Sequence, residues 1–246
     1  DSNEIGSLTR SFNIMTEEIQ NLMRQSEQEQ RAKRKYELKA LQSQISPHFL
    51  YNTLDSIIWM AEWGKNKEVV TMTSSLARLL RRTISNEQEQ VTIGEELDCT
   101  EAYLTIQKMR YKDKLEFEIN VDPSINSVHI VKLVLQPIVE NALYHGLEGM
   151  YGDGEIVIHA YTKDGDLYIS VKDNGMGMSK EQAEALLDYT KELKTAKGNG
   201  IGVRNVHERI QLHFGKEYGV QIISEEDEGT EILLHLPAIM YGEKKE

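Results

Sequence analysis

The stretch of this chain most diagnostic of its architecture is Leu167-Tyr168-Ile169-Ser170-Val171-Lys172-Asp173-Asn174-Gly175-Met176-Gly177. Its apolar first half is typical of a strand, and the glycines that follow indicate a turn where that strand ends. A carboxylate at such a strand end can accept a hydrogen bond from an exocyclic amine, while glycines let a flat base approach the backbone. The stretch therefore predicts one wall of a pocket for a nucleotide base.

Two further segments predict the rest of that pocket. Residues 135–146, LQPIVENALYHG, indicate a helix on which Asn141 offers a neutral oxygen ligand of the kind that suits Mg²⁺. Gly198-Asn199-Gly200-Ile201-Gly202 opens a second helix, whose first N–H groups favour anionic phosphates. Each piece alone is weak, because such glycine runs are often merely turns and such an asparagine is usually a satisfied polar residue. The sequence contains neither G-x-x-x-x-G-K-S/T nor an early G-x-G-x-x-G. The prediction of a nucleotide pocket therefore depends on the three segments occurring together in this order.

These pieces belong to a predicted α+β domain from residue 95 onward. Leu115–Val121 alternates apolar with polar residues, as a half-buried strand does, and Asp164-Gly165-Asp166 is typical of a hairpin turn. Further strands are predicted at Ile156–Ile158, Leu167–Val171, Val220–Ile223 and Ile232–Leu236, and helices at Glu95–Arg110 and Val131–His145. This order favours helices on one side of a mixed or antiparallel sheet.

The N-terminal part is predicted to be helical, with one histidine in a distinctive setting. Pro47-His48-Phe49-Leu50-Tyr51-Asn52-Thr53-Leu54 places an imidazole and, one turn later, an amide on the same helix face. Pro47 interrupts a periodic stretch, so a kink is expected there. A second helix is predicted at Val69–Ile84, with Trp59, Trp63 and Gly64 near the turn. Two such helices cannot bury their apolar stripes alone, which predicts a parallel homodimer with a four-helix bundle.

The first residues predict a coiled-coil seam, because apolar residues recur at spacings of three and four: Ile5, Leu8, Phe12, Met15, Ile19 and Leu22. A lone amphipathic helix is the alternative. The apolar spacing resumes out of phase at Leu38, which indicates either a stutter or a solvated helix. Asp1 stands inside the helical pattern without a methionine, so we expect an excised fragment that lacks its membrane segments.

The composition limits the classes of function that this protein can have. The formal net charge of −12 argues against nucleic-acid binding, which needs clustered cations. The single cysteine, Cys99, cannot form an intramolecular disulfide and suggests a reduced, intracellular thiol. No apolar run approaches the roughly 20 residues that span a bilayer, and no signal peptide occurs. These features favour an intracellular protein that does not bind nucleic acid.

In this order, the motifs resemble those of sensor histidine kinases of the LytS/YesM type. The three pocket pieces, with Gly229-Thr230, look like the nucleotide-binding domain that these kinases share with gyrase, MutL and related chaperone ATPases. Pro47–Leu54 resembles their phosphoacceptor helix, and Asp1–Ile19 resembles the last helix of a HAMP signalling module. The resemblance covers essentially the whole chain. It implies the cytoplasmic part of an inner- or plasma-membrane protein, in contact with the membrane only through missing segments. It implies a HAMP helix at residues 1–24, a signalling helix and dimerisation/phosphotransfer hairpin at 25–94, and an ATP-binding catalytic domain at 95–246.

The resemblance also implies roles in the phosphotransfer part. His48 would be the phosphorylated nucleophile, with His145 beside the pocket as its rival. Asn52 would position a water for dephosphorylating the partner protein, or would simply cap or bond a neighbouring helix. Phe49 replaces the acidic residue that often follows the acceptor, which leaves Glu140 as a weak candidate for the general base.

The nucleotide-binding residues carry over in the same way. Asn141 would bind Mg²⁺, and Asp173 would read the adenine of ATP with support from Thr230. The remaining expected contacts are Gly175 and Gly177 beneath the base, Gly198, Gly200 and Gly202 along the phosphates, and His145. Tyr144 stands where related kinases often have a lysine, and Met178–Lys197 would form a short ATP lid.

The implied activity is autophosphorylation of His48 with ATP, followed by transfer to an aspartate in the receiver domain of a response regulator. Two alternatives stay open. A nucleotide-binding signalling scaffold with weak catalysis is compatible with Tyr144 and Phe49. A gyrase-like ATP hydrolase is disfavoured, because Pro137 stands where those enzymes place the glutamate that activates water.

Overall fold

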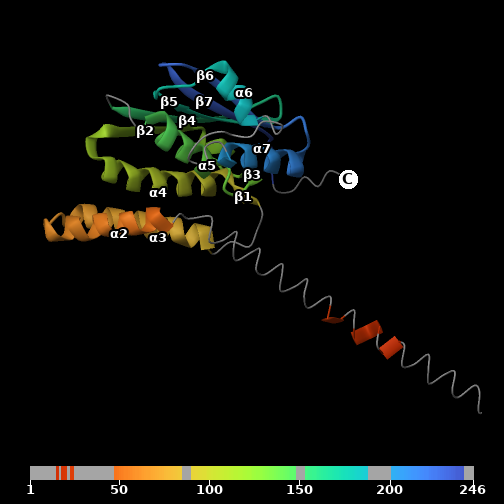
Figure 1. The fold of residues 1–246 in the computed structure, drawn as a ribbon, viewed down its shortest axis with the longest axis horizontal. Coiled ribbons are helices and arrows are strands. Elements are labelled where there is room, and N and C mark those ends of the chain that lie inside the picture. The colour runs from red at the N-terminus through yellow and green to blue at the C-terminus, as the bar shows by residue number, and fades with distance from the viewer. Residues whose placement is uncertain are drawn as a thin grey trace, which may run out of the picture. The chain divides into compact units, whose positions relative to one another are not determined.

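The computed structural model describes residues 15–16, 18–20, 23–24, 47–84, 90–147, 153–187 and 201–240 (Figure 1). The chain divides into two compact units, residues 1–52 and residues 53–246. In the first unit, the short pieces before residue 25 are helical and expose the side chains of Met15, Ile19 and Met23. The rest of the predicted seam and the predicted stutter lie outside the described residues.

Both helices predicted for the hairpin are present. α2 spans Pro47–Glu62 and α3 spans Asn66–Ile84. Gly64 follows α2 with a left-handed φ of +71°. Its N–H donates to Ala61 O at 3.0 Å, and the next N–H, that of Lys65, donates to Met60 O at 2.9 Å. This pair of bonds is the helix cap that favours glycine, so the turn falls where it was predicted. The residues that would show a kink before Pro47 lie outside the described part of the chain.

The second unit contains the predicted mixed sheet. Its strands are β2 (Leu115–Val121), β4 (Gly154–Lys163), β5 (Asp166–Asp173), β6 (Gly219–Glu225) and β7 (Gly229–Pro237), in the spatial order β2-β4-β5-β7-β6. β2 runs parallel to β4, and the other neighbouring pairs are antiparallel. Asp164 and Gly165 join β4 to β5 with φ angles of 54° and 88°, the two-residue turn whose twist matches a hairpin.

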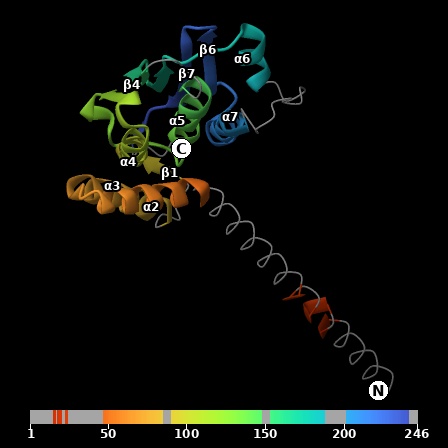
Figure 2. The ribbon, with the colours of Figure 1, turned by 60° about the vertical axis from the view of Figure 1, so that its left-hand side comes forward.

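Helices cover one face of this sheet (Figures 1 and 2). They are α4 (Ile93–Tyr111), α5 (Leu135–Asn141), its wider continuation η3 (Ala142–Leu147) and α7 (Ile201–Phe214). Alternate strand residues such as Ile156 and Ile158 are fully buried, whereas Glu155 between the strand start and Ile156 is exposed. This alternation confirms the predicted half-buried sheet, and the register places Asp173 of β5 opposite Thr230 of β7.

One segment differs from its prediction. Val131–His145 was predicted to be a single helix, but β3 (Val128–Val131) precedes it and pairs with β1 (Gln90–Thr92) and β8 (Ile239–Met240) in a three-stranded sheet. The helix begins only at Leu135, after Leu133 adopts a left-handed φ of 59°. The prediction was wrong for residues 131–134, because a nearly continuous apolar run fits a buried strand as well as a helix.

The predicted lid also differs in part. Lys180–Leu187 forms helix α6, with Ala183 buried. Arg204 of α7 donates to the carbonyl oxygens of Ala185 and Leu186 at 3.1 and 3.2 Å, so this helix is tied to α7. The remainder of the predicted lid, residues 188–197, lies outside the described residues.

Candidate functional site

The predicted base-binding wall is built around a buried carboxylate. Asp173 ends β5 with 3% of its surface exposed. Its Oδ1 accepts the N–H of Gly175 at 2.9 Å, and the backbone N–H of Thr230 also donates to it. Burial raises the pKa of Asp173 to about 6, although these two N–H groups oppose the rise. A carboxylate has about four acceptor positions, so two bonds leave capacity for an amine of a bound base.

The turn after Asp173 depends on glycine for a steric reason. Gly177 has a φ of +64°, and a Cβ added to it would lie 1.9 Å from the carbonyl oxygen of Glu225. Gly229 meets the same limit, because its Cβ would lie 2.1 Å from the carbonyl oxygen of Asp173. The turn and the start of β7 are therefore in backbone contact, which brings Thr230 beside Asp173 as the sequence predicted.

Ser224 links these two segments, and sequence reasoning missed it. Its Oγ accepts the N–H of Met178 at 2.9 Å and donates to the carbonyl oxygen of Gly229 at 2.9 Å. Thr230 Oγ1 lies 2.9 Å away and must be the donor in that pair, since Ser224 has already used its only proton. Thr230 thus holds the turn through Ser224.

The helix that carries Asn141 is fixed at its start by a buried glutamate. Glu96 of α4 is 4% exposed, and its two carboxylate oxygens accept the N–H groups of Leu133 and Leu135 at 3.0 Å each. Arg209 of α7 donates to the carbonyl oxygens of Lys132 and Leu133, at 2.6 and 3.4 Å. Burial raises the pKa of Glu96 despite these bonds. The sequence did not indicate this role, because Glu96 stands among other charged residues of α4 and nothing in the pattern marks it as buried.

The residues predicted at the end of the same helix have different surroundings. Asn141 is the last residue of α5 and is half-buried. Glu140 accepts a bond from Gln136 Nε2 at 3.0 Å, its charge acts on Tyr103 of α4, and burial raises its pKa. The partners of Glu140 therefore lie on its own helix and on α4. The side chain of His145 lies outside the described residues.

The described part of the phosphate loop is Gly202, whereas Gly198 and Gly200 lie outside the described residues. Gly202 is in the first turn of α7, and a Cβ there would lie 3.3 Å from Pro137 Cβ. The glycine thus allows α7 to approach α5 closely.

The predicted phosphoacceptor lies on α2. His48 is exposed, whereas Phe49 beside it is 4% exposed. Asn52 Nδ2 lies 3.1 Å from His48 Nε2 and 3.3 Å from Nδ1, so the amide faces both ring nitrogens. The helix spacing thus brings the predicted pair together, at a ring that is exposed to solvent.

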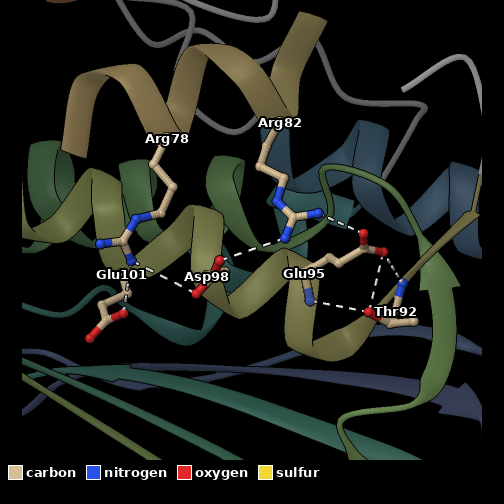
Figure 3. A network of polar contacts seen from close by, with 6 residues as sticks. All are labelled: Arg78, Arg82, Thr92, Glu95, Asp98 and Glu101. Atoms are coloured by element: carbon tan, nitrogen blue, oxygen red, sulfur yellow. Dashed lines mark hydrogen bonds and ion pairs between the residues drawn. The ribbon is translucent and has the colours of Figure 1, made fainter. Parts of the chain in front are cut away.

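An ion-pair network that the sequence did not predict ties α3 to α4 (Figure 3). Arg82 Nη1 lies 2.6 Å from Glu95 Oε1, and its Nη2 lies 3.7 Å from Asp98. Arg78 approaches Asp98 and Glu101 at 3.8 and 3.5 Å. Glu95 also accepts from Thr92 through Oε2, which completes the capping box of α4. Arg82 therefore contacts Glu95, the third residue of α4 and one of the two residues of its capping box.

The donor set fits ATP and Mg²⁺ chemically. A buried carboxylate at a glycine turn suits the exocyclic amine of adenine, and an amide oxygen suits a hard cation. Within the described ranges, no three His, Cys, Asp or Glu side chains gather as a metal site. A single protein ligand is in keeping with Mg²⁺, which usually takes its other ligands from water and substrate phosphates.

Two family models match the chain in the predicted order. The model described as "Histidine kinase" matches residues 36–115, and that described as "Histidine kinase-, DNA gyrase B-, and HSP90-like ATPase" matches residues 126–239. Among solved structures, the catalytic domain of histidine kinase ThkA has a TM-score of 0.46 and 18% identity, over 61% of this chain and 94% of that one. No helix in the described part of the chain has the length and apolarity to cross a membrane.

Two curated relatives align over most of the chain. Sensor histidine kinase YesM of Bacillus subtilis (strain 168) is 41% identical over 234 residues, which cover 95% of this chain and 39% of that protein. Sensor protein LytS of Bacillus anthracis is 31% identical over 201 residues, which cover 82% of this chain and 34% of that protein. The chain thus spans less than half of each relative. With both models and these relatives in agreement, it belongs to the sensor histidine kinases of the LytS/YesM type.

Proposed function

We propose that this chain is the phosphotransfer and ATP-binding part of a kinase that phosphorylates His48 with ATP and passes the phosphoryl group to an aspartate in the receiver domain of a response regulator. The observation that carries the proposal is the exposed His48 ring, with Asn52 Nδ2 within 3.3 Å of both nitrogens, in a chain that also holds the buried Asp173 carboxylate at a glycine turn. A nucleophile and a nucleotide site are the two parts that the reaction requires.

In the first proposed transfer a ring nitrogen of His48 attacks the γ-phosphorus, an N–P bond forms, and the bond to the bridging oxygen breaks as ADP leaves with the electron pair. The ring loses its remaining proton to solvent or to a base. In the second transfer a receiver carboxylate attacks the same phosphorus, the N–P bond breaks, and the ring takes up a proton again, which returns the neutral imidazole. Asp173 would hold the adenine amine. Asn141 would hold Mg²⁺, which when bound neutralises charge on the phosphates.

The domain limits and the assembly belong to the same proposal. Residues 1–24 would be a HAMP helix, residues 25–94 the signalling helix and phosphotransfer hairpin, and residues 95–246 the catalytic domain. The hairpin carries large exposed apolar side chains: Leu54, Ile58, Trp59, Trp63 and Val70. These support a homodimer through a four-helix bundle. The setting would be cytoplasmic, with the membrane reached through other parts of the protein.

The second candidate, a weakly catalytic scaffold, has one observation in its favour. Tyr144, at the position where a lysine would neutralise phosphate charge, lies with its hydroxyl 3.5 Å from Gln107 Nε2 of α4. It therefore supplies no cation.

Labelling with γ-labelled ATP and Mg²⁺ separates the two candidates. We expect acid-labile, alkali-stable label in the parent and none in His48→Ala. His159→Ala, which removes another exposed histidine, should label like the parent. Label that persists in His48→Ala would move the acceptor elsewhere, with His145 tested next. ATP binding without any label would favour the scaffold.

A further inference from the structure

The backbone changes its winding directly after Asn141. α5 ends at Asn141, and residues Ala142–Leu147 continue as a π-helical turn, η3. The N–H of Ala142 is shared between the carbonyl oxygens of Ile138 and Val139, which marks the point of change. π turns are rare and are frequently found at functional sites. Because the regular α-helical hydrogen bonds are interrupted there, an outside contact can fix the course of this turn.

That outside contact comes from two buried polar residues of α4. Tyr103 is 1% exposed and Gln107 is fully buried. Gln107 Nε2 donates to Tyr103 Oη at 2.8 Å and lies 3.5 Å from Tyr144 Oη in η3. The Tyr103 hydroxyl is also hydrogen-bonded to Tyr144. Three polar groups from two elements therefore meet in one buried cluster.

The cluster is oriented from its far side. Gln107 Oε1 accepts a bond from Arg110 Nη1 at 2.8 Å, which fixes the amide so that its NH₂ group points to the two phenols. With the NH₂ donating to Tyr103, the Tyr103 proton is free to be donated to Tyr144. Tyr103 is buried whereas Tyr144 is half-buried. If η3 moved away, the Tyr103 hydroxyl would lose this partner inside the protein, so the bond favours the observed position of the turn.

We propose that Tyr103 and Gln107 are positioning residues for the metal site: by holding Tyr144 they fix the wide turn after Asn141, and so aim the amide of Asn141. The inference rests on the proposed function, in which Asn141 binds Mg²⁺. Glu96, seven residues before Tyr103 on the same helix, holds the start of this segment through Leu133 and Leu135. α4 thus supports the segment that carries Asn141 at both ends.

The structure also gives a reason for tyrosine at position 144. A lysine there could bring a cation to the phosphates, but it could not accept the Tyr103 proton, because its ammonium group only donates. The chain uses this position to anchor the turn, and the phosphate charge must be met by other groups.

The test compares Tyr103→Phe, Tyr144→Phe and the double variant in the whole chain. Tyr161→Phe makes the same change on the exposed side of the sheet, at a residue 45% exposed. A fluorescent ATP analogue is bound first in EDTA and then across a Mg²⁺ titration, and the melting temperature is recorded. We expect each single variant to raise the Mg²⁺ concentration at half-saturation about threefold to tenfold, the scale of one buried hydrogen bond.

The pattern among the variants decides the matter. Both single variants lose the bond between the two phenols, and each also loses its own contact with Gln107. The fold-change of the double variant should therefore be smaller than the product of the two single fold-changes. Affinity in EDTA should change less than about twofold, well below the effect expected from a lost hydrogen bond. An unchanged Mg²⁺ requirement, or an equal loss with and without Mg²⁺, would overturn the positioning role.

Asn141→Ala separates this inference from the proposed function. If that variant loses the Mg²⁺ effect while the tyrosine variants keep it, the metal assignment stands and the positioning role fails. If Asn141→Ala keeps the parental Mg²⁺ requirement, the metal assignment fails, and the positioning role fails with it.

Discussion

Asp173 is a residue at which binding and stability conflict. Its carboxylate is buried at the end of β5, and burial raises its pKa from 3.8 to about 6. Well below pH 3.8 the group is neutral in the folded and unfolded chains, so it has no effect on the stability difference. Between pH 3.8 and about pH 6 the unfolded chain releases this proton while the folded chain still keeps it, so the unfolded chain is increasingly favoured, and above about pH 6 the penalty stays constant. Stability is therefore lost with rising pH.

Asp173→Asn should remove this penalty while it weakens ATP binding. The shift corresponds to about 2 to 3 kcal/mol at pH 8, and the gain should vanish near pH 4. Urea unfolding followed by circular dichroism at both pH values measures it. Asp122→Asn is a control for which the expected change in stability has the opposite sign, because the N–H of Ser124 lowers the pKa of Asp122. It should not gain stability at pH 8. A parental unfolding midpoint for Asp173→Asn at pH 8 would contradict the argument.

Gly177 gives a second prediction at this scale. A methyl group there meets the carbonyl oxygen of Glu225 and also requires a left-handed φ. Gly165 has a φ of +88° with nothing within 4 Å of its would-be Cβ, so it isolates the backbone effect. Gly165→Ala should lose about 1 kcal/mol of stability, and Gly177→Ala should lose at least about 2 kcal/mol more. Equal losses in urea unfolding would show that the contact with Glu225 is unimportant.

At the scale of elements, the α3–α4 network is a set of weak contacts that share partners. Asp98 lies near both arginines, and Glu95 serves Arg82 and the capping box at once. The side chains are 35–53% exposed, so solvent and salt screen them. Each exposed pair is worth about 0.2 to 1 kcal/mol. The network thus gives a contact between helices that changes in ionic strength can weaken.

A double-mutant cycle of Arg82→Ala with Glu95→Ala should measure this contact. We expect a coupling of about 0.5 to 1 kcal/mol at low salt that falls by half or more at high salt. Arg82→Ala combined with Glu118→Ala should be additive, because Glu118 lies on β2 and is not one of the two carboxylates, Glu95 and Asp98, that Arg82 contacts in the network. A salt-independent coupling would point to packing between the helices instead of charge.

At the scale of the whole molecule, the described part of the chain exposes large apolar side chains on the hairpin. Ile58 is 54% exposed and Trp59 is 62% exposed. A charge at Ile58 should oppose a bundle, because it would be buried without a partner. We expect Ile58→Glu to lower the mass from dimer to monomer in light scattering at micromolar concentration. Leu212→Glu, at a residue of α7 that is 84% exposed, should stay dimeric. A dimeric Ile58→Glu would place the interface elsewhere.

Features of the fold and of the site could be predicted from the sequence where a short local motif also has a characteristic chemistry. Asp173 and Asn141 stand in short motifs whose types and spacing limit what they can do. Glu96 and Ser224 could not be predicted in the same way, because each acts on backbone far along the chain: Glu96 on Leu133, 37 residues away, and Ser224 on Met178, 46 residues away. The three-stranded sheet was missed for a related reason, since its strands are short and distant in sequence.

Pro137 and Gly202 have a consequence for how such an enzyme could change over evolutionary time. The two residues nearly touch, with 3.3 Å between Pro137 Cβ and the place where a Cβ of Gly202 would be. A glutamate at 137 is the change that resemblance to gyrase would ask of a hydrolase, and its side chain would start from a Cβ that already lies against the first turn of α7. That turn carries Gly202, the last glycine of the predicted phosphate loop. We therefore expect a change at 137 to require an adjustment of α7, which would separate phosphate transfer from wasteful ATP turnover by more than one genetic step.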